Sequence, residues 1–141
     1  MLSLTTARRL KTAGLAWRPT LHDFFAVPDR GMDDRVFVLS DMSVDIELLK
    51  GQSIVTFNGT SEWALDYELM SEVVWMPTEE QLRGALERRL APGELPPFKL
   101  IHAPDGYWCE IRLAGQSLSF RAAEASEAYA EALLYVLEKN P

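Results

Sequence analysis

Residues 72–90 read Glu72-Val-Val-Trp-Met-Pro-Thr-Glu-Glu-Gln-Leu-Arg-Gly-Ala-Leu-Glu-Arg-Arg-Leu90. The run Val73-Val-Trp75 favours a short strand, and Pro77 ends it because proline has no N–H to donate to a sheet. Thr78 followed by Gln81 matches a capping box, in which the threonine hydroxyl accepts a hydrogen bond from the N3 amide and the glutamine side chain reaches back to the cap. This stretch therefore predicts a strand, a stop and a helix that begins after Thr78.

The charged and apolar residues of this segment are also distributed as a helix requires. Two glutamates follow the cap, where the helix dipole is positive, and Arg88 and Arg89 lie at the negative end. Apolar residues recur at helical spacing, which predicts a buried stripe. The stripe consists of Leu82, Ala85, Leu86 and Leu90.

Alternating apolar residues and turn signals predict the strands outside this stretch. Residues 22–40 are typical of a hairpin with a longer loop, and Pro104-Asp-Gly106 is a tight-turn signal between two further strands. Residues 41–71 are harder to assign, because Val44, Ile46, Leu48 and Leu49 fit neither the helix period nor the strand period well. The predicted strands cover residues 22–28, 35–39, 53–57, 98–103, 107–113 and 117–121.

Three further helices are predicted from caps and spacing. The first begins at Thr5 or Thr6 as N-cap and ends at Gly14. A short helix is predicted between residues 60 and 70, and the last helix begins near residues 124–126. The apolar face of the last helix is Ala125, Tyr129, Ala132, Leu133, Val136 and Leu137, with Glu127, Glu131, Glu138 and Lys139 outside it.

These elements predict a single α+β domain over residues 1–141, with a mainly antiparallel sheet of five to seven strands packed by two to four helices. The length of 141 residues suits one core. The loop 91–97 is linker-like and separates a 1–90 part from a C-terminal part, 98–141, of hairpin, strand and helix. Because 44 residues are few for an independent core, we interpret 91–97 as a loop inside one domain.

The net charge is −7 and is unevenly distributed, with +4 in residues 1–20 and −8 in residues 21–72. Neutralising phosphates needs a basic surface, so we expect no nucleic acid as a partner. No apolar run approaches the roughly 20 residues of a membrane span, so we expect no membrane partner. The single cysteine suits a reducing compartment, which favours a cytoplasmic location.

The sequence contains no complete motif for a catalytic nucleophile, a metal site or a phosphate-binding loop. His22, Asp23 and His102 would supply metal ligands if their strands were neighbours, but neither histidine has a metal-site spacing. Cys109 alternates in register with Ile111, which predicts a buried small hydrophobe rather than a reactive thiol. We therefore predict no catalytic residue, no metal and no cofactor.

The candidate site in the sequence is aromatic and acidic. Trp63, Tyr67 and Trp75 lie close in sequence to Asp66 and Glu72. Aromatic rings supply contact area and carboxylates supply selectivity, so this mixture suits a cationic or aromatic ligand or a protein partner. The alternative is that these tryptophans complete the core.

The functional hypothesis is a non-catalytic cytosolic protein-interaction or regulatory module, whose acidic and aromatic middle meets a basic partner. Self-association is included, since the basic N-terminal helix of one protomer can meet the acidic surface of another. The alternative hypothesis is a small-molecule-binding domain or minor hydrolase. In that alternative Trp63, Tyr67 and Trp75 wall a pocket, and Asp66 or Glu72 is its polar group.

Three motifs carry a family resemblance: Leu10-Lys-x-Ala-Gly-Leu-x-Trp-x-Pro19, Asp23-x-Phe25 and Glu72-Val-Val-Trp-x-Pro-Thr-Glu-x-Gln-Leu-Arg83. Together they resemble a family of small bacterial proteins of unknown function, some of which carry a pilus-assembly label. The resemblance implies no catalytic residue, and the phosphate-binding loop of a pilus-assembly ATPase does not occur. The C-terminal piece, ending in Ser126-Glu-Ala-x-Ala-Glu-Ala132, resembles antitoxins with a partly degraded double-stranded-RNA-binding fold, without the basic loop expected for RNA.

Overall fold

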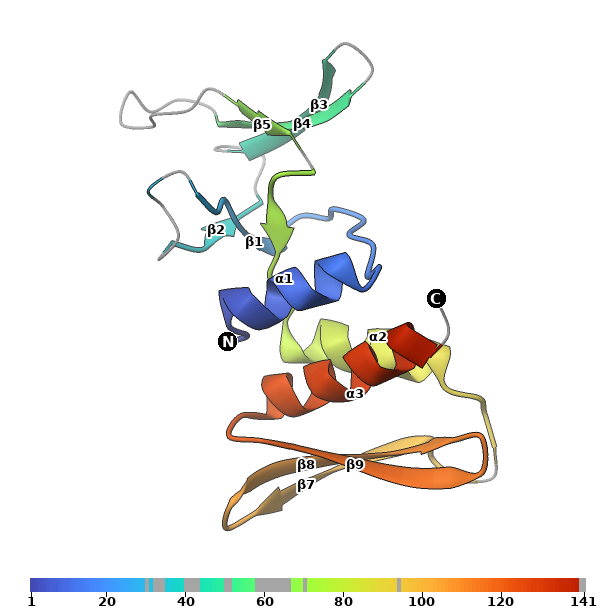
Figure 1. Ribbon diagram of the computed structural model, residues 1–141. Coiled ribbons are helices and arrows are strands. Elements are labelled where there is room, and N and C mark those ends of the chain that lie inside the picture. Colours follow the sequence, from blue (N-terminus) through green and yellow to red (C-terminus); the bar gives the residue numbers. More distant parts are fainter. Residues whose placement is uncertain are drawn as a thin grey trace. The chain divides into compact units, whose positions relative to one another are not determined.

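The computed structural model (Figure 1) shows two compact units. The main unit comprises residues 1–15 and 77–141, and the inserted unit comprises residues 16–76. The structure describes only the backbone of 44–49, 52–57 and 67–69. The described residues are 1–29, 31, 35–39, 44–49, 52–57, 67–69, 71–93 and 95–139.

The main unit combines three helices with one three-stranded antiparallel sheet of order β7-β8-β9. Its connections are short, so α2, the three strands and α3 follow each other directly along the chain. The elements are α1 (Leu4–Thr12), α2 (Glu79–Arg89), β7 (Phe98–Ala103), β8 (Gly106–Leu113), β9 (Gln116–Ala122) and α3 (Ala125–Lys139).

Helix α2 begins and ends as its sequence predicts. Thr78 is the N-cap, and its hydroxyl accepts a hydrogen bond from the Gln81 amide at 3.2 Å. In return the Gln81 side chain accepts a hydrogen bond from the Thr78 amide at 2.9 Å. Leu82, Ala85 and Leu86 are buried on one face. The predicted capping box and buried stripe are confirmed.

The sheet of the main unit has an inner face that packs on α3. Pro104 and Asp105 form the turn from β7 to β8, as the tight-turn signal predicts. The ring of Phe98 on β7 meets Tyr129 edge-on at 5.9 Å between centroids, and Phe120 on β9 lies 5.5 Å from Tyr135. Aromatic contacts from both edge strands therefore hold α3 across the sheet.

Helix α3 is the centre of the main unit. It contacts α1, α2, β8 and β9, and nine of its fifteen residues are buried. Figure 1 shows α1 on one side of α3 and the sheet on the other. A helix with several buried faces belongs between layers rather than on a surface. The predicted apolar face is buried except for Ala125, which is half-buried, and burial extends beyond it to Ala128, Ala130 and Leu134.

The N-cap of α1 is Ser3, so the predicted cap at Thr5 or Thr6 is wrong. The Ser3 hydroxyl accepts a hydrogen bond from the Thr6 amide at 3.2 Å, which starts the helix before Thr5. Thr6 is instead the third helical residue, and its hydroxyl points to the neighbouring helix. Ser3, Thr5 and Thr6 are all residue types that cap helices well, and the contact of Ser3 with α3 favours the earliest of them.

Glu127 of α3 completes this cap from outside the helix. Its carboxylate accepts hydrogen bonds from the Ser3 backbone amide at 2.8 Å and from the Thr6 hydroxyl at 2.7 Å. In an ordinary capping box the residue three positions after the cap accepts from the cap amide. Here a carboxylate 124 positions away in sequence does so. The cap of α1 therefore doubles as its attachment to α3.

A second acid of α3 holds the basic side of α1. Both guanidinium nitrogens of Arg9 donate to Glu131, at 2.6 and 3.3 Å. This bidentate contact raises the pKa of the Arg9 guanidinium. Glu127 and Glu131, predicted to lie outside the apolar face of α3, thus form the polar part of its contact with α1. The basic charge at Arg9 is paired within its own chain.

We expect Glu127→Ala to lower the free energy of unfolding by about 1–2 kcal/mol, because it removes two hydrogen bonds to a charged acceptor at a helix cap. Urea unfolding followed by circular dichroism measures this change. Glu87→Ala, at an exposed position of α2, is the matched control and should change stability by less than about 0.5 kcal/mol. Equal effects of the two variants would show that the cap adds nothing to stability.

The inserted unit contains one sheet of order β2-β1-β6, formed by β1 (Phe24–Ala26), β2 (Phe37–Val38) and β6 (Val74–Trp75). Strands β1 and β2 pair antiparallel, so the predicted hairpin over residues 22–40 is confirmed. Strand β6 pairs with the other side of β1 and lies within the predicted strand of residues 73–75. The sheet therefore joins segments from both ends of the inserted unit.

The other sheet of the inserted unit has the order β3-β4-β5 and comprises β3 (Val44–Leu49), β4 (Gln52–Phe57) and β5 (Tyr67–Leu69). Strand β4 confirms the strand predicted at 53–57. The short helix predicted over residues 60–70 is wrong at 67–69, which pair antiparallel with β4. Backbone pairing with a neighbouring strand outweighs weak helical spacing in a segment this short. Residues 60–66 and 70 lie outside the described residues.

The α+β class, the antiparallel pairing and the packing of helices on a sheet are confirmed. The described strands form three three-stranded sheets. Two of these strands, β3 and β5, were not among the seven predicted. Loop 91–97 lies inside the main unit, as predicted, and the chain divides instead at residues 15–16 and 76–77. The single domain over 1–141 stays a prediction. In the described part of the chain, no helix is long and apolar enough to cross a membrane.

Candidate functional site

The structure describes the five residues of the predicted aromatic and acidic site to different extents. Trp63 and Asp66 lie outside the described residues. Tyr67 begins β5, where only its backbone is described, and Glu72 is exposed in the turn before β6. Trp75 is half-buried on β6. That these five residues form one site stays a prediction.

Trp75 belongs to the first sheet of the inserted unit, and the ring of Trp17 packs on that sheet. Phe25 is fully buried there, and its ring lies 5.8 Å from Trp17 and 5.6 Å from Phe37. Trp75 pairs with Phe25 through the backbone, and its buried Nε1 has no hydrogen-bond partner among the described residues. The contacts of Trp17 favour the interpretation that this tryptophan completes a core.

The carboxylate of Asp23 is used inside the protein. Asp23 is 4% exposed, and its Oδ2 accepts hydrogen bonds from Trp17 Nε1 at 2.9 Å and from the Thr20 amide at 3.0 Å. His102, in the main unit, stacks on Tyr107 with 4.4 Å between ring centroids. No group of three metal-ligating side chains occurs within the described residues. Asp23 is thus a structural residue that ties the segment 17–23 together.

Cys109 is buried against α3 on the inner face of the sheet. Its side chain is inaccessible, and desolvation raises the pKa of the thiol to about 12. A thiol with this pKa carries almost no thiolate at neutral pH, and the thiolate is the reactive form. The predicted burial of Cys109 is confirmed.

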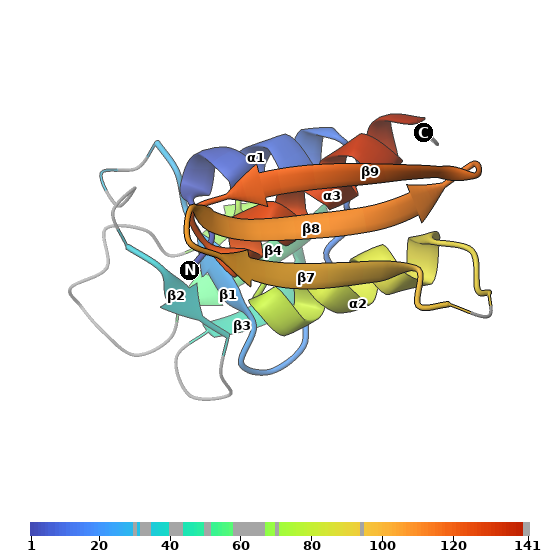
Figure 2. The same cartoon turned by 90° about the horizontal axis from the view of Figure 1, so that it is seen from below.

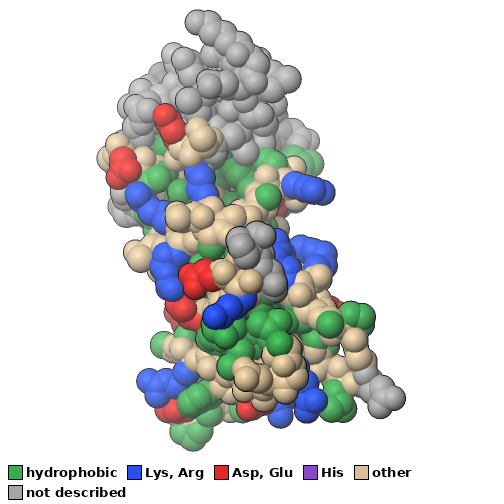
Figure 3. All heavy atoms as spheres, turned by 45° about the vertical axis from the view of Figure 1, so that its right-hand side comes forward, with side chains coloured by type: hydrophobic (Ala, Val, Ile, Leu, Met, Phe, Trp, Pro, Cys, Tyr) green, Lys and Arg blue, Asp and Glu red, His purple; other side chains and the backbone are tan. Residues whose placement is uncertain are grey.

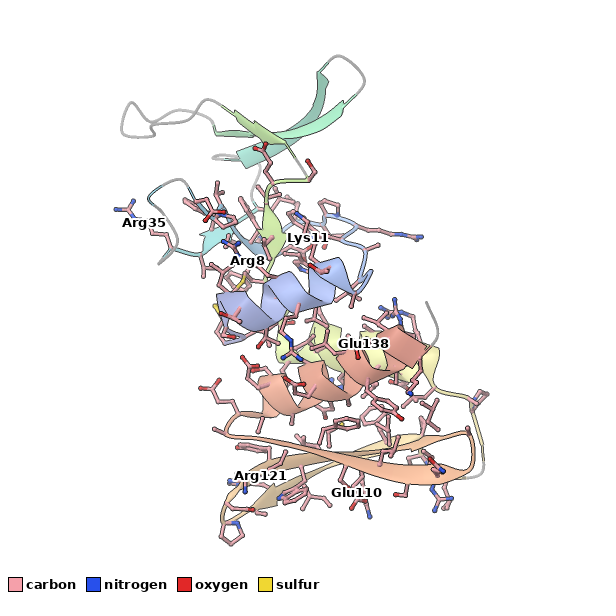
Figure 4. The ribbon with its side chains drawn as sticks, in the orientation of Figure 1. Arg8, Lys11, Arg35, Glu110, Arg121 and Glu138 are labelled. Carbon is pink, nitrogen blue, oxygen red and sulfur yellow. The ribbon has the colours of Figure 1, made fainter. Side chains whose placement is uncertain are left out.

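The opposite side of the same sheet faces solvent. We call it the outer face, and Figure 2 looks onto it, with no described element of the main unit in front of the strands. Figure 4 shows Glu110 and Arg121 pointing away from α3 on this side. Cross-strand register places its side chains in three rows: Pro97, Arg112 and Ser117; Lys99, Glu110 and Ser119; and Ile101, Trp108 and Arg121.

The outer face carries a tryptophan held by a carboxylate. Asp105 accepts hydrogen bonds from Trp108 Nε1 and from Arg121 Nη1, both at 3.2 Å and through different oxygens. The bond from the Trp108 indole, with the Arg121 bond and charge adding to it, lowers the pKa of the Asp105 carboxyl. Ile101, opposite Trp108 on β7, is 37% exposed. A half-buried indole and an exposed guanidinium are therefore held together by one carboxylate, beside an exposed aliphatic side chain.

A hollow of about 210 Å³ lies at the other end of the outer face. Leu95 and the two prolines that precede β7 form its apolar wall, and Arg112 and Ser117 lie at its rim. Leu95 is 58% exposed although it is apolar. Figure 3 shows such hydrophobic side chains at the surface of the main unit, with Lys and Arg side chains around them.

The negative charge of the protein belongs to the inserted unit. Residues 16–76 contain eleven acids and four bases, so the net charge of this unit is −7, the same as that of the whole chain. The main unit contains ten acids and ten bases and is neutral. The acidic middle predicted from the sequence thus coincides with one structural unit, and the outer face belongs to the other.

The residues of the outer face were not among the predicted site residues. The alternation of β8 already placed Cys109 and Ile111 on one side, so Trp108 and Arg112 had to lie on the other. Alternation shows on which side of a strand each side chain lies, but it does not show whether another layer covers that side. Comparison of the chain with protein-family models, with curated proteins and with solved structures finds no match.

Proposed function

We propose that this protein is a non-catalytic protein-interaction module that binds its partner through the outer face. The observation that carries the proposal is the solvent-facing row of Ile101, Trp108 and Arg121. Tryptophan and arginine are enriched among the residues that contribute most to protein binding. The outer face presents both of them next to an exposed aliphatic side chain.

Fixation of the indole supports this proposal. Asp105 bonds both Trp108 and Arg121, so the two side chains lose less conformational freedom on binding than free side chains would. A preorganised surface of this kind favours affinity without a change in backbone structure. The hydrogen bonds are exposed, so they set the position of the rings and contribute little to folding.

The size of the hollow also favours a protein partner. Pockets for small molecules commonly measure about 300–1,000 Å³ and bury most of the ligand. The hollow measures about 210 Å³ and opens onto the outer face. It suits one side chain of a larger partner better than a whole small molecule.

We expect Trp108→Ala to abolish capture of the partners that the wild-type chain retains from a lysate of its host. The measurement is affinity purification with quantitative mass spectrometry, using the wild type and variants at equal loading. Arg88→Ala, at an exposed position of α2, is the control on a different surface and should retain the same partners. Circular dichroism checks that both variants fold.

Self-association is one form that binding through the outer face can take. If the partner is a second copy, wild-type protein sediments as a dimer and Trp108→Ala as a monomer. Arg9 is paired with Glu131 of its own chain, so we do not expect the basic helix α1 to drive this association. Identical partner sets and identical sedimentation for the wild type and Trp108→Ala would exclude the outer face as the binding surface.

A further inference from the structure

Arg112 is the charged residue of the hollow that has no partner within the described part of the chain. It is exposed, and it forms no ion pair or side-chain hydrogen bond with any residue that the structure describes. The other charges at the hollow neutralise each other, because Lys99 Nζ lies 3.2 Å from Glu110 Oε2. Among the described residues, the hollow therefore combines an apolar wall with one uncompensated positive charge.

The wall of the hollow is held in place by the backbone. The Arg112 amide donates to the Pro97 carbonyl at 3.1 Å, which extends the β7–β8 pairing one residue into the loop. Pro96 and Pro97 have fixed φ angles and no amide donors. One hydrogen bond thus fixes Pro97, a part of the apolar wall, beside the base of the Arg112 side chain.

From this geometry we propose that the hollow binds an acidic segment of a partner protein, with an apolar side chain against Leu95 and Pro97 and a neighbouring carboxylate on Arg112. The inference rests on the proposed function and specifies the chemistry of the partner. A guanidinium binds a carboxylate through two parallel hydrogen bonds, which makes arginine a selective reader of Asp and Glu. An apolar segment without an acid would leave this charge unmatched.

The rest of the outer face can extend the same contact. The row of Trp108 lies four residues along β8 from Arg112, which is about 13 Å at strand geometry. A segment of several residues therefore reaches from the hollow to the indole. Arg121 and Lys99 keep their ion pairs with Asp105 and Glu110, so the acidic residue of the partner is expected on Arg112.

The test uses the full-length chain and a random peptide display library. We expect the enriched peptides to carry Asp or Glu next to a large apolar residue. Synthetic versions of these peptides, measured by fluorescence anisotropy at about 0.15 M salt, should bind Arg112→Gln about tenfold more weakly. Arg88→Gln removes an exposed arginine of α2 and should leave the affinity unchanged. Amide shifts on titration should cluster at residues 95–99 and 110–119.

Charge reversal gives the sharper version of the test. Arg112→Glu should reject the acidic peptides and should bind copies in which Lys replaces Asp and Glu better than the wild type does. Arg112 is exposed, so these variants should keep the fold, and circular dichroism checks this.

Three outcomes would overturn the inference: enrichment of peptides without acids, equal binding by Arg112→Gln, or displacement of the peptides by a thymidine oligonucleotide. If peptides bind through Trp108 but ignore Arg112, the proposed function stands and the acidic ligand is wrong. If the chain enriches no peptide and captures no partner, both fail.

Discussion

Leu133→Ala is expected to lower the free energy of unfolding by about 2–5 kcal/mol, the range measured for truncation of leucine in a packed core. Leu133 has no exposed surface and lies on α3, which contacts α1, α2 and two strands. The cavity would open between layers that are held by different segments of the chain. Since small proteins are commonly stable by about 5–15 kcal/mol in total, this change can leave the main unit only marginally folded.

The chain offers an identical substitution as a control. Leu95→Ala removes the same atoms at a position that is 58% exposed, so it should cost less than about 1 kcal/mol. Urea unfolding followed by circular dichroism compares the two variants. Hydrogen exchange at residues 98–122 shows whether the loss for Leu133→Ala extends to the sheet. Similar effects of the two substitutions would mean that α3 is not the centre of the main unit.

The parts of the fold that were predictable are those in which local signals agree. Helix α2 has a capping box, a charge pattern and an apolar stripe, and all three place its start after Thr78. Strands β7, β8 and β9 were predicted from their alternating apolar residues, and Pro104-Asp-Gly106 marks the turn between the first two. In such segments local preference and tertiary contacts favour the same structure, so no information from elsewhere in the chain is needed.

The errors fall where a distant segment decides the local structure. The cap of α1 is Ser3 because Glu127 of α3 accepts hydrogen bonds from its amide and from Thr6. Residues 67–69 form a strand because their backbone pairs with β4. Neither Glu127 nor the edge of β4 is adjacent in sequence to the segment that it determines. Periodicity and cap preference cannot contain this information.

The candidate site was missed for a related reason. Trp108 and Arg112 alternate with buried residues, and the sequence shows their side of β8 correctly. Whether that side is covered depends on where the helices of the main unit pack, and α3 packs on the inner face. The site predicted from the sequence includes Trp63, Tyr67 and Trp75, because aromatic and acidic residues are concentrated in that segment. Of these, only Trp75 has a described side chain.

Gly106→Ala is the second substitution expected to have a large effect, with a loss of about 2–4 kcal/mol. Gly106 has a φ of +130°, which is unfavourable for residues with a Cβ. A Cβ there would also lie 2.6 Å from the carbonyl oxygen of Ala122, which is a backbone atom and cannot rotate away. The variant must therefore either strain residue 106 or separate the start of β8 from the end of β9.

Gly115→Ala separates these two causes, because Gly115 has a φ of +77° and a Cβ added there would have no described atom within 4 Å. It should cost only the conformational part, about 1 kcal/mol. The clash at Gly106 lies next to the Asp105 contacts, so Gly106→Ala should also shift the Trp108 indole resonance and weaken peptide binding, whereas Gly115→Ala should do neither. Equal stabilities and unchanged indole resonances in both variants would show that the approach of Gly106 to Ala122 does not hold the outer face in shape.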